Sequence, residues 1–294
     1  MIKRTLEIST DGHFLSVKND QLVLSREREV VSTIPCEDVG LLIVDSKSTI
    51  FTHDALVRVC EYGGFVVLCG SNHHPAAMLV PTVANEIQTQ RVRLQATAKL
   101  PLVKQMWRQI VQTKIRNQGG TLPDAHPART ALFAMVPKVR SGDPANVEAR
   151  ASRLYWPALF NDAKFRRQRE GQPPNNLLNY GYMALRAATA RAVCGAGLHP
   201  SLGLSHHNKY NPFCLADDLM EPYRPFVDRC VVKLVAEGKI QIDQETKREL
   251  LAVLTQTVTV GDADGPLMVA LHKTASSVVN VLSGEEERLA LPQP

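Results

Sequence analysis

The chain has 294 residues, 44% of them hydrophobic, and a formal net charge of +5. This length suits one large domain or two of ordinary size, and the apolar share is typical of a globular protein with a core. The longest apolar runs, such as 65–69, are far too short to cross a bilayer, and the N-terminal MIKRTLEIST has no apolar signal core, so we expect a cytoplasmic protein. The six cysteines form no C-x-x-C pair, which argues against a zinc ribbon and favours free thiols.

The first part of the sequence is rich in short β-like segments. Asp11-Gly12 and Asn19-Asp20 are dipeptides that favour hairpin turns, and they separate alternating or β-branched runs. The expected strands cover residues 5–9, 13–18, 21–25, 29–35, 39–44, 49–51 and 65–69. Residues 53–61 have the apolar spacing of a helix. We therefore predict a compact β domain with one helix over residues 1–78.

A second domain is expected after a short linker. Pro75 and Pro81 flank a segment that we interpret as a loop, with residues 79–84 as the linker. The pattern from Asn85 onward is helical, so residues 85–294 are predicted to form a larger all-α catalytic domain and the fold class is α+β. The expected helices cover 85–118 (interrupted by Pro101), 129–138, 147–160, 176–194, 222–237, 243–258 and 266–282. Residues 119–127 are predicted to be a loop, and 284–294 a frayed tail.

Several acidic residues are candidates for chemistry. Asp218 and Glu221 are three residues apart, so they share a face if they lie on one helix. Proline is tolerated mainly in the first turn of a helix, and Pro222 follows directly, so we place the helix start near Asp217 or Asp218. The helix macrodipole alone would also explain acids at that position. Spacing alone does not distinguish Glu148 from an ordinary solvent-facing acid.

Two histidines, His206 and His207, precede this helix. One imidazole and several carboxylates can hold a hard divalent cation with open coordination positions. A zinc site made by His206, His207 and Cys214 is an alternative, but its spacing matches no standard zinc pattern.

Basic side chains are concentrated in two segments. Residues 85–118 contain the single acid Glu86, and a second basic cluster lies at 164–169. The basic residues are Arg91, Arg93, Lys99, Lys104, Arg108, Lys114 and Arg116 in the first segment, and Lys164, Arg166, Arg167 and Arg169 in the second. A solvated helix face usually carries interspersed acids, so these segments are candidates for contact with a phosphate backbone. Trp107 and Trp156 are expected in the core.

Four segments resemble one known family. They are Glu148 to Trp156, the NNLLNYGY of 175–182, the GLHPSLGLSH of 197–206 and the CLADDLMEPYRPFVD of 214–228. Together they resemble the CRISPR-associated spacer-acquisition integrase, the metal-dependent DNA endonuclease of CRISPR adaptation, along the whole chain. The last segment and the short first domain look like those of type II systems. The chain departs from the family pattern where Val147 and Ala149 flank Glu148 in place of glycine, and where Trp156 replaces phenylalanine.

The resemblance implies a site and an activity. Glu148, His206 and Glu221 would be the catalytic ligands of Mg²⁺ or Mn²⁺, and Asp218 would be a further ligand or a support for the ligands. A DNA 3′-hydroxyl would attack the leader–repeat phosphodiester of a CRISPR array, and water at the same site would give nuclease activity. The residues expected to hold the DNA are Arg91, Arg93, Lys99, Lys104, Arg108, Lys164, Arg166 and Arg167.

The resemblance also implies partners. These are double-stranded DNA with single-stranded ends, a second copy of the chain bound through the β domain, a small ferredoxin-like adaptation partner, and the RNA-guided effector nuclease of a type II system. Three alternatives remain at this point. They are a non-catalytic nucleic-acid-binding scaffold of the same fold, a metal-dependent repair nuclease acting on branched DNA, and a purely structural helical protein.

Overall fold

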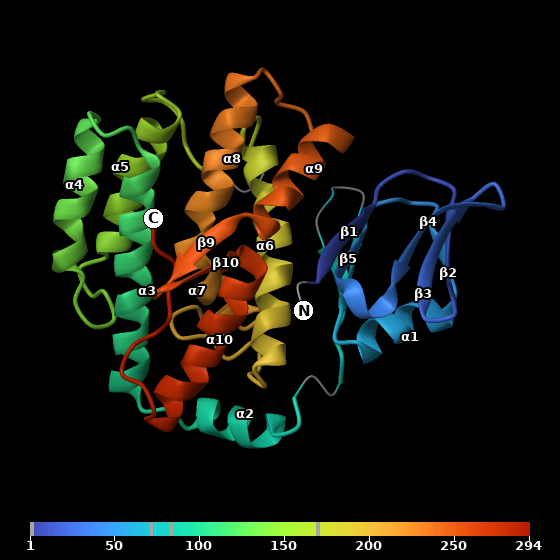
Figure 1. The fold of residues 1–294 in the computed structure, drawn as a ribbon. Helices are drawn as coiled ribbons and strands as arrows, with labels where there is room; N and C mark the ends of the chain where they lie inside the picture. The colour runs from blue at the N-terminus through green and yellow to red at the C-terminus, as the bar shows by residue number, and fades with distance from the viewer. Residues whose placement is uncertain (1–2, 71–72, 74, 83–84, 169–170) are drawn as a thin grey trace. The chain divides into compact units, whose positions relative to one another are not determined.

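The structure, a computed structural model, describes residues 3–70, 73, 75–82, 85–168 and 171–294 (Figure 1). The chain divides into two compact units, residues 1–86 and 87–294. The first is built from strands and one α-helix, and the second is mostly helical. The fold class is therefore the predicted one, a β-rich first part followed by a larger helical part.

The first unit contains two four-stranded sheets. One has the order β1-β5-β7-β8 and the other β4-β3-β2-β6. In the first sheet β1, β5 and β7 are parallel, and β8 is antiparallel to β7. The strands are β1 (Arg4–Ile8), β2 (His13–Lys18), β3 (Gln21–Arg26), β4 (Glu29–Pro35), β5 (Val39–Val44), β6 (Ile50–Phe51), β7 (Phe65–Cys69) and β8 (Pro75–Leu79), with α1 at His53–Glu61 and the 3-10 turn η1 at Cys36–Asp38.

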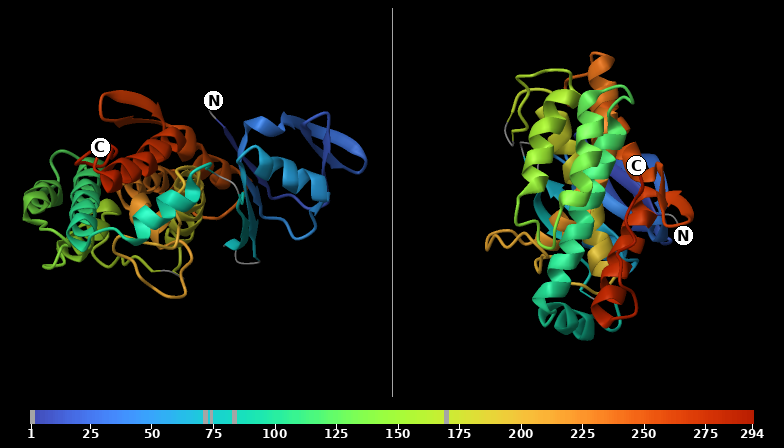
Figure 2. Two further views of the ribbon diagram at one scale, coloured as in Figure 1. Left: turned by 90° about the horizontal axis from the view of Figure 1, so that it is seen from below. Right: turned by 90° about the vertical axis from the view of Figure 1, so that its left-hand side faces the viewer.

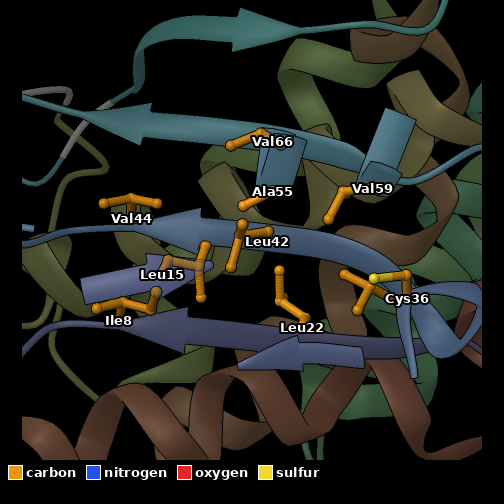
Figure 3. Close-up of a cluster of buried hydrophobic side chains, with 10 residues drawn as sticks. Ile8, Leu15, Leu22, Cys36, Leu42, Val44, Ala55, Val59 and Val66 are labelled. Atoms are coloured by element: carbon orange, nitrogen blue, oxygen red, sulfur yellow. The ribbon is translucent and has the colours of Figure 1, made fainter. Parts of the chain in front are cut away.

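Local sequence explains most of these elements. Asn19 and Asp20, between β2 and β3, both have positive φ angles (51° and 56°), the conformation that a two-residue hairpin turn requires. The helix α1 begins where the Thr52 hydroxyl accepts a hydrogen bond from the backbone N–H of Ala55. Both sheets and α1 contribute to one hydrophobic cluster, in which Leu22 and Val59 are buried (Figure 3).

The loop predicted between Pro75 and Pro81 is wrong for its first five residues. Pro75–Leu79 form the strand β8 and pair with β7 at an edge of the sheet. A proline at the first position of an edge strand loses no ladder hydrogen bond, so it does not prevent pairing.

The second unit is organised around α6 (Asn175–Gly195), which packs against α7, α8, α9 and α10. The helices of this unit are α2 (Gln88–Ala96), α3 (Leu100–Thr121), α4 (Pro127–Met135), α5 (Val147–Leu159), α6, α7 (Cys214–Met220), α8 (Arg224–Ala236), α9 (Gln244–Ala252) and α10 (Leu267–Ser283), with the 3-10 turns η2 (Val136–Lys138), η3 (Glu221–Tyr223) and η4 (Val253–Thr255). Gly181 allows α6 to approach α8, because a Cβ there would lie 2.4 Å from Cγ1 of Val227.

The predicted interruption near Pro101 is present, because the segment forms two separate helices, α2 and α3. Residues 97–99 separate α2 from α3, and Pro101 lies in the first turn of α3. At its other end α3 continues through Gly119 to Thr121, where a loop was predicted. A Cβ on Gly119 would lie 3.3 Å from the Phe133 ring of α4, so close packing between the two helices outweighs the low helix propensity of glycine.

The C-terminal end of the second unit differs from prediction in two places. The helix expected over 243–258 ends earlier, and β9 (Thr257–Val260) forms a hairpin with β10 (Ala263–Pro266) beside α10 (Figure 2). The tail predicted to fray at 284–294 is held in place: the Gln293 N–H donates to the Thr259 carbonyl at 2.9 Å, and the Asn117 amide donates to the Pro292 carbonyl at 3.2 Å. Among the described residues, none of the helices combines the length and apolar character that crossing a membrane requires.

Candidate active site

Three acids from separate elements of the second unit form the candidate site. Glu148 lies in the first turn of α5, Asp218 lies in α7, and Glu221 begins η3. The predicted helix start near Asp217 or Asp218 is wrong, because α7 begins at Cys214 and ends at Met220. Pro222 lies in the first turn of η3, which follows α7. It therefore marks the start of η3 and not the start of α7.

Glu148 and Glu221 meet at one ammonium group. The Nζ atom of Lys114, in α3, lies 2.6 Å from Oε1 of Glu148 and 2.6 Å from Oε2 of Glu221. The Lys114 side chain is 10% exposed and that of Glu221 is 5% exposed, whereas Glu148 is 25% exposed. Two carboxylates 73 positions apart in sequence therefore share one cation in a largely desolvated place.

Arg224 completes the charge balance of this cluster. Its guanidinium lies 2.9 Å from Oε1 of Glu221. Burial raises the pKa of Glu221, but the positive charges of Arg224 and Lys114 outweigh burial and hold that pKa below its usual 4.5. Because the folded-state pKa is lowered, this carboxylate stabilises the fold above about pH 4.5, and the contribution is lost as the pH falls through the folded-state pKa.

Asp218 positions His206. The Oδ1 atom of Asp218 lies 2.5 Å from Nδ1 of His206, and Oδ2 accepts the backbone N–H groups of Leu204 (2.6 Å) and Ser205 (2.9 Å). The hydrogen bond that the imidazole donates to Asp218 raises the pKa of His206, and burial opposes this effect. A histidine whose Nδ1 binds a carboxylate has a fixed ring orientation and keeps Nε2 for a metal, as metal-ligating histidines usually do.

The loop before His206 approaches Asp218 because residue 203 is glycine. A Cβ on Gly203 would lie 2.4 Å from the His206 carbonyl oxygen and 2.9 Å from Oδ2 of Asp218. Both distances are below the 3.0 Å that Cβ atoms keep from other heavy atoms, so a side chain at 203 would push the loop off the carboxylate.

We expect Asp218→Asn to slow metal-dependent DNA cleavage by about 10- to 100-fold, the range seen when a group that supports a metal ligand is lost. Asparagine keeps one acceptor oxygen, but it presents an amide donor either to the loop N–H groups or to Nδ1 of His206. The measurement is the single-turnover cleavage rate with Mn²⁺, with Asp262→Asn on the exposed turn after β9 as the matched control. An unchanged rate would mean that Asp218 does not position His206 for the reaction.

The donor atoms fit a hard divalent cation in kind. Glu148 and Glu221 already share a cation, and His206 is near enough to Glu221 for its positive charge to lower the pKa of that carboxyl. Oε2 of Glu221 is buried and forms no hydrogen bond of acceptable geometry within the described part of the chain, although it contacts Lys114. Within that part no three His, Cys, Asp or Glu side chains are grouped closely enough to hold a metal, and this applies both to the predicted set of Glu148, His206 and Glu221 and to the alternative set of His206, His207 and Cys214.

The residues expected to bind DNA fall into two groups. Five of them are exposed: Arg93, Lys99, Lys104, Lys164 and Arg166. The other three are half-buried: Arg91, Arg108 and Arg167. The guanidinium of Arg91 donates to the Ala196 carbonyl at 2.9 Å, and that of Arg167 donates to the side chain of Asn179 at 2.6 Å, so both also support the helical unit. Arg169 lies outside the described residues.

Sequence reasoning missed two members of the site. Lys114 was grouped with the basic face of 85–118, but it is buried in the cluster and forms no part of that face. Arg224 was quoted only as part of a motif. The three-residue spacing of Glu221 and Arg224 was an available signal for that pair, whereas nothing near Lys114 in sequence indicates its partners.

Comparison with known proteins identifies the class to which this fold and site belong. Residues 6–259 match the family described as CRISPR associated protein Cas1. A CRISPR-associated endonuclease Cas1 from Neisseria meningitidis is 33% identical over 298 residues, which cover 100% of this chain and 97% of that protein. The chain therefore belongs to the Cas1 family.

Other relatives and solved structures agree over nearly the whole chain. A CRISPR-associated endonuclease Cas1 from Francisella tularensis is 26% identical, with 95% of each chain covered. A casposase bound to integration product has a TM-score of 0.80 at 17% identity, covering 98% of this chain and 92% of the casposase. A chain of a Cas6-RT-Cas1–Cas2 complex has a TM-score of 0.78 at 19% identity, covering 97% of this chain and 35% of that one. These structures share the fold.

Proposed function

We propose that this chain is a metal-dependent DNA integrase and endonuclease that inserts new spacers into a CRISPR array. The observation that carries the proposal is that Glu148 and Glu221 both contact the ammonium group of Lys114 in a Cas1-family fold. The relatives are named as endonucleases, and the casposase of similar fold is described with an integration product, which supports a reaction on DNA phosphodiesters.

The chemistry is strand transfer. The oxygen of an incoming 3′-hydroxyl forms a bond to the phosphorus at the leader–repeat boundary, and the bond from phosphorus to the leaving 3′-oxygen breaks. The attacking hydroxyl gives its proton to solvent or a nearby base, and the leaving oxygen takes up a proton from solvent to become a new 3′-hydroxyl. When water replaces the 3′-hydroxyl, the same exchange is hydrolysis. A bound Mg²⁺ or Mn²⁺ would supply Lewis-acid stabilisation of the phosphoryl and leaving oxygens.

The protein's own residues would place and orient the reactants. Glu148, Glu221 and Nε2 of His206 would hold the cation, and Asp218 would keep the imidazole in position. The exposed cations would hold the DNA backbone, with little dependence on base sequence. Attacking and leaving oxygens must lie nearly in line, so this placement is the larger part of catalysis.

The partners follow from the same proposal. The β-rich first domain, which the sequence predicts over residues 1–78 with a linker at 79–84, would join two copies of the chain. A small ferredoxin-like adaptation partner would bridge such dimers, and the Cas6-RT-Cas1–Cas2 complex, which contains a chain of this fold, supports a protein partner of that kind. In a type II system the RNA-guided effector nuclease would be a further partner.

An integration assay tests the proposal. Purified protein and adaptation partner are mixed with a labelled DNA duplex with single-stranded 3′ ends and a plasmid that carries a leader and one repeat. We expect joined product at the leader–repeat boundary with Mn²⁺ or Mg²⁺ and none after chelation by EDTA. Metal-dependent cleavage of branched DNA without joining would favour a repair nuclease. DNA binding without any turnover would favour a scaffold, and absence of DNA binding at moderate salt would favour a structural protein.

A further inference from the structure

Lys114 has an unusual position for a member of a basic helix. Lys99 and Lys104, on the same segment, are exposed, whereas Lys114 is buried and its Nζ atom lies 2.6 Å from an oxygen of Glu148 and of Glu221. These carboxylates come from α5 and η3, and Lys114 comes from α3, so three elements meet at one ammonium group. These contacts hold the ammonium group of Lys114 inside the protein, away from solvent.

The ammonium group and a divalent cation would require the same oxygens. Mg²⁺ binds carboxylate oxygens at about 2.0–2.1 Å, and Mn²⁺ binds the same kind of ligand. Oε1 of Glu148 and Oε2 of Glu221 are already in contact with Nζ. Two cations that close together in a desolvated cluster repel strongly, so the ammonium and the metal exclude one another there.

We propose that Lys114 is a positioning residue that takes the place of the metal: its ammonium group holds Glu148 and Glu221 together in the metal-free protein and must leave both when the divalent cation binds. This inference rests on the proposed function, since it concerns the same site. The flexible four-carbon stem of lysine permits such a withdrawal without movement of α3. Lys114 therefore keeps the two carboxylates arranged and charged, and it makes metal binding weaker than the bare carboxylates would allow.

The test is the affinity for Mn²⁺ in the absence of DNA, measured by electron paramagnetic resonance or calorimetry. Lys114→Met removes the competing charge and keeps an unbranched apolar stem. We expect the variant to unfold at a lower temperature without metal and to bind Mn²⁺ about tenfold more tightly than the wild type, the scale of one charge-assisted hydrogen bond. Lys138→Met, which removes an exposed lysine from η2, is the control and should change neither value.

Two results would overturn the inference. One is a folded Lys114→Met protein that binds Mn²⁺ as the wild type does, or more weakly. The other, which does not depend on the variant folding, is a crystal structure of the wild type with Mn²⁺ between the glutamates and Nζ of Lys114 still in contact with both. A wild type that binds no Mn²⁺ and integrates DNA without metal would overturn the proposed function as well, so the two failures are distinguishable.

Discussion

Glu221→Gln is expected to reduce Mn²⁺-dependent cleavage and strand transfer by about 10³-fold or more, because a metal that stabilises phosphoryl charge contributes several kcal/mol. Glutamine keeps the shape of the side chain and removes the negative charge that would hold the cation. It also leaves Lys114 and Arg224 with Glu148 as the remaining carboxylate of the cluster. Affinity for duplex DNA should change by less than about threefold, because phosphate contacts come from other residues.

The measurement is a single-turnover assay with labelled DNA at saturating Mn²⁺, accompanied by thermal unfolding. Glu245→Gln is the matched control, since Glu245 is 55% exposed and its partner is the surface residue Lys239. A folded Glu221→Gln protein with wild-type turnover would remove Glu221 from the catalytic site. A variant that melts far below the wild type should be replaced by Glu148→Gln, which tests the other side of the same pair.

His206→Ala should lose about 10²- to 10³-fold of metal-dependent activity, while His207→Ala should stay within about threefold of the wild type. Both histidines are exposed, but of the two only His206 has its Nδ1 atom fixed by the buried Asp218, whereas His207 lines a pocket with Leu202 and Lys209. The two variants form a matched comparison because His206 and His207 are adjacent in the sequence. The loop should survive the change, since Asp218 still accepts the N–H groups of Leu204 and Ser205.

Rates of cleavage at several Mn²⁺ concentrations check this expectation. Loss of a ligand should raise the Mn²⁺ concentration needed for half-maximal rate as well as lower the maximum. Equal losses in both histidine variants, or a loss in His207→Ala alone, would contradict the assignment of His206.

The first unit could be predicted well because its information is local. Alternating or β-branched residues define β2 and β4, and the Asn19-Asp20 turn defines the hairpin between β2 and β3, without reference to distant parts of the chain. The β8 strand was missed because its pairing with β7 is what creates it. Its own sequence, PAAML, has little strand character.

In the second unit the errors occur where tertiary contacts decide the structure. The hairpin β9–β10 and the final segment support one another, with Pro292 bridging to Val260. The end of α7 depends on η3, which starts a new turn at Glu221. A single sequence contains no local record of such contacts, so a helix was extended through Val258 and a helix start was placed near Asp218.

Only part of the candidate site could be predicted from the sequence. Family motifs identify Glu148, His206 and Glu221, and the structure brings the two glutamates to a common partner. The role of Lys114 depends on burial among residues 34 and 107 positions away, so in sequence it resembles its exposed neighbours. The metal-binding and DNA-binding roles stay predictions.

The adjacent positions 202 and 203 differ greatly in the substitutions that they tolerate. Leu202 is exposed, and a substitution there has room to be accommodated. One methyl group at 203 would collide with the His206 carbonyl and the Asp218 carboxylate at once. An engineer who wishes to redesign this loop can therefore vary its outer residues, while the single hydrogen-atom side chain beneath them has no substitute among the other nineteen amino acids.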